Sequence, residues 1–240
     1  MNPTTVGSRL VFQNAVASIK RAGLNPAGAV LSQSYLRLET ALVQNQTQYN
    51  FDVLVNESAN GTFNTQNKLN LQDAFVASSL GFYLACPIGG TATNTEYKLL
   101  TYPTIGLEFG GGAGNFTAAQ AEDALAFYNG YFSLTINQRV IVPYWDLMRH
   151  LQIPRTQNNA VVSNPAATVS APVAPLHFTG DQYDGAQDGQ YPIEPNITFV
   201  GSKKHSFQVT LPAGIANIPT GSRVVALMRG ILAQNVTSVN

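Results

Sequence analysis

Apolar and polar residues alternate in several short segments of this chain, and this period of two constrains the fold more than any other feature. Successive side chains of a β-strand point to opposite faces of a sheet, so the alternation is typical of a half-buried strand. The same pattern predicts one strand over residues 132–142 and another over 207–211. It is clearest after Gln46, where the alternating apolar residues are Tyr49, Phe51, Val53 and Val55.

Further segments extend the list of expected strands to about eight. Residues 224–232 are almost continuously apolar, which is typical of a strand buried on both faces. The remaining β-rich stretches are 69–85, 96–102, a short piece around 173–178, and 197–199.

Two segments have the pattern of helices. Residues 5–22 carry Val11, Ala15 and Ile19 on one stripe, and Gly23 provides a stop. A second helix is expected from Thr117, which forms a capping box with Gln120, up to Gly130. A single helical turn is also expected at 147–151.

The order of these elements predicts the fold class. Strands do not alternate regularly with helices, which disfavours a parallel α/β sheet. We therefore expect an all-β protein, a jelly-roll β-sandwich of about eight strands with an N-terminal helix and one inserted helix. We divide it into an N-terminal helical arm, residues 1–45, and a single jelly-roll domain, residues 46–240. A proline-rich loop is expected at about 155–195 within that domain.

The charge content is low and balanced. Only 11% of residues are charged, against about 25% in an average soluble domain. Thirteen bases balance thirteen acids, while 21 Asn and 16 Gln supply polarity. This balance disfavours a strongly basic nucleic-acid-binding protein, and low net charge promotes association. The charges are nevertheless segregated: residues 1–38 carry +4, 39–155 carry −4, 156–202 carry −4, and 203–240 carry +4.

Residues with catalytic or metal-binding chemistry form no recognisable motif. His150, His177 and His205 are widely separated, and neither H-x-H nor H-E-x-x-H occurs. The single cysteine, Cys86, lies in an apolar stretch and is expected to be a buried small side chain. The sequence therefore predicts a protein that is not an enzyme, with no catalytic residues, metal site or cofactor.

Three other features leave alternatives open. The glycine run 110–114 has the composition of a phosphate-binding loop or of a flexible loop before a helix, and the second interpretation explains it fully. Asp181, Asp184 and Asp188 form either a solvated acidic loop or a calcium site. Trp145 either stacks on a sugar or anchors the end of a loop.

In outline, the chain resembles capsid proteins of small icosahedral bacteriophages built on jelly rolls. The resemblance covers most of the chain without a diagnostic motif. It rests on the N-terminal helix, on residues 69–73 leading into the strand 81–84, and on the terminal pair 196–199 and 207–212.

The resemblance implies a structural virion protein, a self-assembling capsid subunit without catalysis. It is expected in the virion after assembly in the host cytoplasm, because residues 1–11 lack a signal peptide and no apolar run is long enough to span a membrane. Its expected partners are copies of itself and other capsid proteins, with no small-molecule substrate. The basic N-terminal arm is a candidate for contact with genome or an internal membrane.

Two other classes of function remain as alternatives. One is a carbohydrate- or receptor-binding β-sandwich module, with Trp145, Tyr183 or Tyr191 as its aromatic platform. The other is a jelly-roll enzyme, which the absence of ligand spacing makes the weakest alternative.

Overall fold

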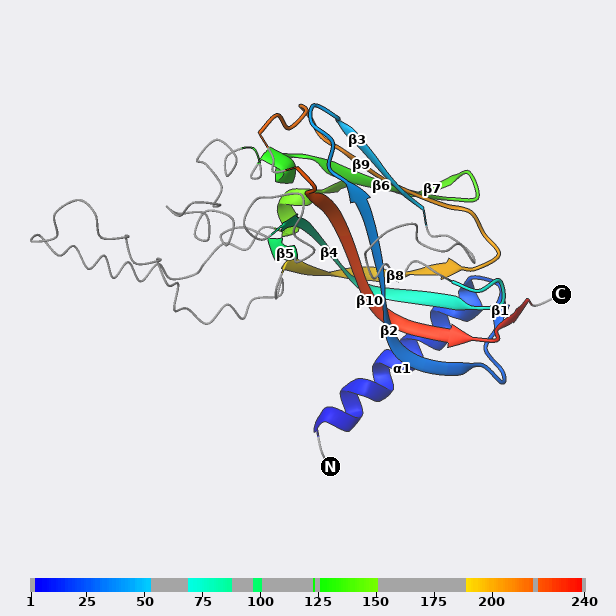
Figure 1. Ribbon diagram of the computed structural model, residues 1–240. Helices are drawn as coiled ribbons and strands as arrows, with labels where there is room; N and C mark the ends of the chain where they lie inside the picture. The colour runs from blue at the N-terminus through cyan, green and yellow to red at the C-terminus, as the bar shows by residue number, and fades with distance from the viewer. Residues whose placement is uncertain are drawn as a thin grey trace, which may run out of the picture.

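Two main antiparallel β-sheets, a two-stranded ladder, one α-helix and two 3-10 turns form the regular structure of the described residues (Figure 1). The computed structural model describes residues 3–52, 69–87, 97–100, 123, 126–150, 189–217 and 220–238. Its elements are α1 (Pro3–Arg21), β1 (Leu24–Asn25), β2 (Val30–Ala41), β3 (Gln48–Asp52), β4 (Ala74–Pro87), β5 (Tyr97–Leu100), the 3-10 turn η2 (Phe127–Asn129), β6 (Tyr131–Ile136), β7 (Arg139–Asp146), the 3-10 turn η3 (Leu147–His150), β8 (Gln190–Val200), β9 (His205–Thr210), β10 (Arg223–Gln234) and β11 (Thr237–Ser238).

The two main sheets have different strand orders. The first has the order β2-β10-β4-β5. Strand β8 also pairs with β4, along the first part of that strand, whereas β5 pairs with its last part. The second has the order β3-β9-β6-β7, and a small ladder joins β1 to β11. The predicted all-β architecture with an N-terminal helix is thus confirmed, and the arrangement is consistent with a β-sandwich.

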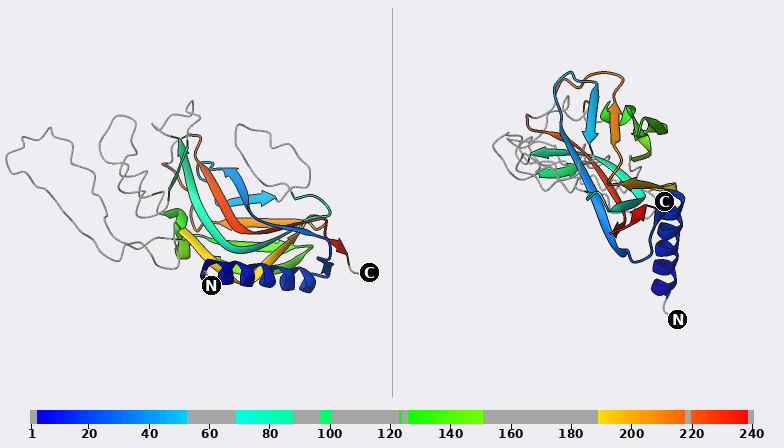
Figure 2. Two further views of the ribbon diagram at one scale, coloured as in Figure 1. Left: turned by 90° about the horizontal axis from the view of Figure 1, so that it is seen from below. Right: turned by 90° about the vertical axis from the view of Figure 1, so that its right-hand side faces the viewer.

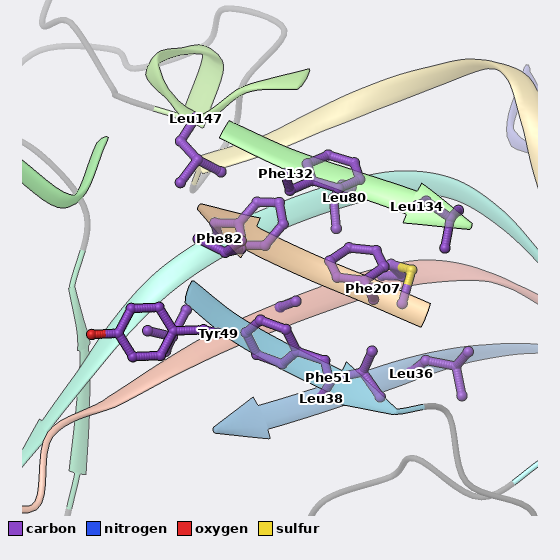
Figure 3. Close-up of a cluster of buried hydrophobic side chains, with 14 of the residues drawn as sticks. Leu36, Leu38, Tyr49, Phe51, Leu80, Phe82, Phe132, Leu134, Leu147 and Phe207 are labelled. Atoms are coloured by element: carbon purple, nitrogen blue, oxygen red, sulfur yellow. The ribbon is translucent and has the colours of Figure 1, made fainter. Parts of the chain in front are cut away.

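The core lies between the two sheets (Figure 3). Phe82 on β4 packs against Phe132 on β6 and Phe207 on β9, with ring centroids 5.1 and 5.8 Å away. Tyr49 and Phe51 are buried as their alternation predicts. The period of two therefore identified which side chains of these strands face the core.

Helix α1 covers part of the outer face of the first sheet (Figure 2). Its stripe residues Ala15 and Ile19 are buried in a second cluster with Val76, Val200 and Ile231. The predicted helix is confirmed within two residues at its N-terminal end, and Gly23 follows it with φ of +81°. Apolar periodicity predicted the helix and the burial of Ala15 and Ile19, whereas Val11 of the same stripe is 42% exposed.

The segment expected as an N-terminal helical arm, residues 1–45, also contains a strand over residues 30–41 that the sequence analysis did not predict. These residues form β2, which pairs with β10 along its entire length. Leu36 and Leu38 are buried in the core, while their neighbours on β2 are more exposed. The strand belongs to the sheet because the long strand β10 offers a complete hydrogen-bonding edge.

Two further expectations need correction. Residues 132–142 form two strands instead of one, because Asn137 and Gln138 adopt positive φ and reverse the chain between β6 and β7. The loop expected at about 155–195 ends earlier, since β8 begins at Gln190 and buries Ile193. The start of this strand was not predicted because the segment is rich in proline, which is typical of loops.

Several predictions lie outside the described residues. They are the start of the helix expected at Thr117, the strand around 173–178, and the glycine run 110–114. The end of the Thr117 segment is described and forms η2, followed by Gly130.

Candidate functional site

One aromatic and basic cluster joins the end of β7 to the start of β8. The Trp145 indole Nε1 donates a hydrogen bond to His150 Nε2 at 3.0 Å. The Arg149 guanidinium lies over the Trp145 ring at 4.7 Å and near the Tyr191 ring at 5.6 Å. Trp145 and Tyr191 also meet edge to face. Trp145 is therefore engaged as an anchor between these segments, one of the two roles expected for it.

His150 is fully buried in this cluster, beside Phe82. Its Nδ1 lies 2.9 Å from the carbonyl oxygen of Gly189, so Nδ1 carries the proton and Nε2 accepts from Trp145. Burial lowers the pKa of His150 to about 4, because a charged imidazolium would be desolvated there. The ring is thus a neutral bridge between β7, η3 and β8.

His205 is the second buried histidine. Its Nε2 accepts a hydrogen bond from the backbone N–H of Val200, and its ring packs against Phe199. Burial lowers its pKa to about 4, and the nearby Lys203 acts in the same direction. Neither His150 nor His205 belongs to a group of three His, Cys, Asp or Glu residues suited to a metal, within the residues that the structure describes.

We expect these histidines to make the fold sensitive to mild acid. Their folded pKa values of about 4 lie below 6.5, so the unfolded chain binds protons first as the pH falls. Their stabilising effect is complete above pH 6.5 and is lost progressively as the pH falls towards 4. At about pH 5 the loss is about 2 kcal/mol for each histidine.

Urea unfolding at neutral and acidic pH measures this loss. The variants His150→Phe and His205→Phe should each lose about 2 kcal/mol less than the wild type between pH 7 and pH 5. An identical pH dependence in the wild type and the double variant would contradict the assignment.

Cys86 is buried, as predicted. The Ser222 hydroxyl donates a hydrogen bond to its sulfur at 3.6 Å. Burial raises the pKa of the Cys86 thiol to about 11, so the thiolate that reacts as a nucleophile is scarce at neutral pH. The position of Cys86 is that of a packing residue in β4.

A buried carboxylate connects two strands on the outer face of the first sheet. Glu39 on β2 has a side chain only 1% exposed and forms an ion pair with Arg37. Its other oxygen lies 3.6 Å from Arg223 on β10. This ion-pair network links β2 to β10 and accounts for three of the chain's charges.

Other residues singled out in the sequence lie outside the described part of the chain. These are His177, Tyr183 and the acidic residues Asp181, Asp184 and Asp188.

An exposed apolar strip on β7 and η3 was missed by sequence reasoning. Val140, Ile141, Tyr144 and Met148 are 56%, 42%, 62% and 51% exposed. We call these four residues the β7 strip. The signal was the adjacent pair Val140-Ile141, which breaks the alternation expected of a half-buried strand.

The strip lies on a strand at the edge of its sheet. Two irregularities in the pairing with β6 interrupt β7, and Pro143 lies within the second. Bulges and proline on an edge strand oppose the addition of another strand, because they break the row of hydrogen-bonding groups. A partner at this edge would therefore contact the side chains of the strip.

No protein-family model matches the chain, and a search of curated proteins found no match. Within the described residues, no helix is long and apolar enough to cross a membrane.

Proposed function

We propose that this protein is a jelly-roll capsid subunit, a structural virion protein that assembles with copies of itself and with other capsid proteins. Two features support the proposal. One is the order in which the strands pair, and the other is the β7 strip.

The nested order of strand pairing supports the jelly-roll part of the proposal. Without the short β1, β5 and β11, eight strands remain in the two sheets. The first pairs with the last (β2 with β10), and the second with the seventh (β3 with β9). The third pairs with the sixth (β4 with β8), and the fourth with the fifth (β6 with β7). A long hairpin rolled into two sheets produces this order, and viral capsid domains are among the proteins that use it.

The β7 strip is the observation that carries the assembly proposal. Four exposed large apolar side chains on one edge strand and the turn after it are candidates for burial in a protein contact. The composition of the chain also favours association. Its low net charge and abundant amides reduce repulsion between identical subunits. A shell subunit buries such a surface against its neighbours in symmetric or quasi-symmetric contacts.

Assembly of the purified protein tests the proposal. We expect sedimentation velocity and electron microscopy to detect closed particles in the wild type. The double variant V140D/Y144D should remain a folded, unassembled protein, because two carboxylates would be desolvated in the contact.

Val43→Asp is the matched control. Val43 is 50% exposed and lies between β2 and β3, away from the strip, so this variant should assemble normally. A wild type that stays monomeric at high concentration would contradict the proposal. So would a double variant that assembles as well as the wild type.

A further inference from the structure

Five basic residues lie at one end of the two sheets. Lys20 and Arg21 end α1, Arg139 begins β7, and Lys203 and Lys204 lie in the turn between β8 and β9. We call these residues the basic end. Figure 1 shows the end of α1, the β6–β7 turn and the β8–β9 turn on the same side of the molecule.

Specific contacts bring these segments together. The Asn137 N–H donates to the Lys204 carbonyl oxygen, and the Lys204 N–H donates to Asn137 Oδ1, both at 2.9 Å. Ile19 of α1 and Val200 of β8 share one buried cluster, and the Lys203 N–H donates to the Val200 carbonyl oxygen. These contacts hold the backbone segments that carry the bases at one end of the fold.

Among the residues that the structure describes, few acids lie at the same end as these bases. Asp73 lies at the same end, but it is 5% exposed and accepts hydrogen bonds from Asn70 and the Asn235 N–H. Asp52 ends β3 there, opposite Ser206. Lys20, Arg21, Arg139 and Lys204 are exposed, whereas Lys203 is half-buried. Counted over the described residues, the basic end thus carries a net positive charge.

An exposed leucine lies among these bases. Leu71 is 61% exposed in the turn before β4. A side chain at Gly201 would meet the Asn70 carbonyl oxygen at 1.8 Å and the Leu71 Cα at 3.2 Å, so the turn carrying Leu71 packs directly on the turn carrying the two lysines. An apolar side chain beside lysines suits the boundary between lipid headgroups and acyl chains.

A small pocket opens at the same end. Its volume is about 340 Å³, and its lining residues are Thr135, Asn137, Gln138, Lys204 and Ser206. Hydroxyl, amide and ammonium groups can all donate hydrogen bonds to an anion. The pocket is therefore chemically suited to a phosphate group.

We propose that the basic end docks on an anionic phospholipid surface, with the lysines near the headgroup phosphates and Leu71 inserted among the lipids. Bases near such a surface attract it, and a membrane favours an exposed leucine more than a nucleic-acid backbone does. In an assembled shell this end would face a bilayer, a point that rests on the proposed function. Lipid binding by the isolated protein does not depend on it.

Flotation with phosphatidylglycerol vesicles tests the proposal, using phosphatidylcholine vesicles for comparison. We expect the wild type to bind only the anionic vesicles. K203Q/K204Q should weaken that binding about 30-fold, since each base near the surface contributes about 1 kcal/mol. Leu71→Ser should weaken it by a smaller factor. Arg229→Gln, which removes an exposed arginine within β10, should bind like the wild type.

Three results would overturn the proposal. They are no binding to anionic vesicles, unchanged binding by K203Q/K204Q, and preferential binding to a single-stranded oligonucleotide through the same lysines. Circular dichroism verifies that the variants are folded. Every protein in the flotation, the reference included, carries V140D/Y144D so that it stays unassembled. A failure of flotation therefore leaves the shell proposal standing, and a failure of wild-type assembly leaves lipid binding to be judged by flotation.

Discussion

Replacing Phe82 with alanine is expected to lower the free energy of unfolding by about 3–5 kcal/mol. The Phe82 side chain is 0% exposed and lies on β4 in the first sheet. Its ring contacts Phe132 and Phe207 of the second sheet and His150 of η3. Alanine would remove apolar contacts between both sheets and leave a cavity where they meet (Figure 3).

Reversible urea unfolding followed by circular dichroism measures this loss. Phe82→Leu keeps most of the apolar volume and should lose less stability than Phe82→Ala. Val43→Ala, at a 50% exposed position, should stay within about 0.5 kcal/mol of the wild type. If Phe82→Ala loses under about 1 kcal/mol, the central packing described here is wrong.

Gly230→Ala should also destabilise the fold, by about 1–3 kcal/mol. A Cβ at position 230 would lie 1.9 Å from the Val76 carbonyl oxygen, a backbone atom that cannot rotate away. The close approach arises where the pairing of β10 with β4 shifts between Arg229 and Gly230. An alanine would force the central strands of the first sheet apart.

The adjacent Arg229 supplies the matched control for Gly230. Its side chain is exposed, so Arg229→Ala should change the free energy of unfolding by about 0.5 kcal/mol or less. Thermal and urea unfolding of both variants measure the difference. A Gly230→Ala variant as stable as Arg229→Ala would show that β4 and β10 do not approach as described.

Local patterns in the sequence predicted much of the secondary structure. The helix is recognisable from Val11, Ala15 and Ile19, whose spacing depends only on helix geometry. The strands β3 and β9 are recognisable from alternation. β2 was missed because it lies in a segment assigned to the arm, and its role depends on β10 at the opposite end of the chain.

The candidate site and the binding surfaces were much less accessible from the sequence. Trp145 was singled out, but its partners His150 and Tyr191 are identified only by the folded structure. The exposure of the β7 strip depends on irregular pairing with β6, which composition does not reveal. The two buried histidines have ordinary sequence neighbours, and only burial gives them lowered pKa values.

The sequence by itself determined the β character, the N-terminal helix and the separation of charge along the chain, because these depend on side chains near one another in sequence. The tertiary structure decided which strands pair, which side chains are buried, and that Lys20, Arg139 and Lys204 lie at one end. Pairing between distant strands depends on burial and on complete hydrogen bonding summed over the whole fold. A local sequence pattern therefore does not predict which distant strands pair.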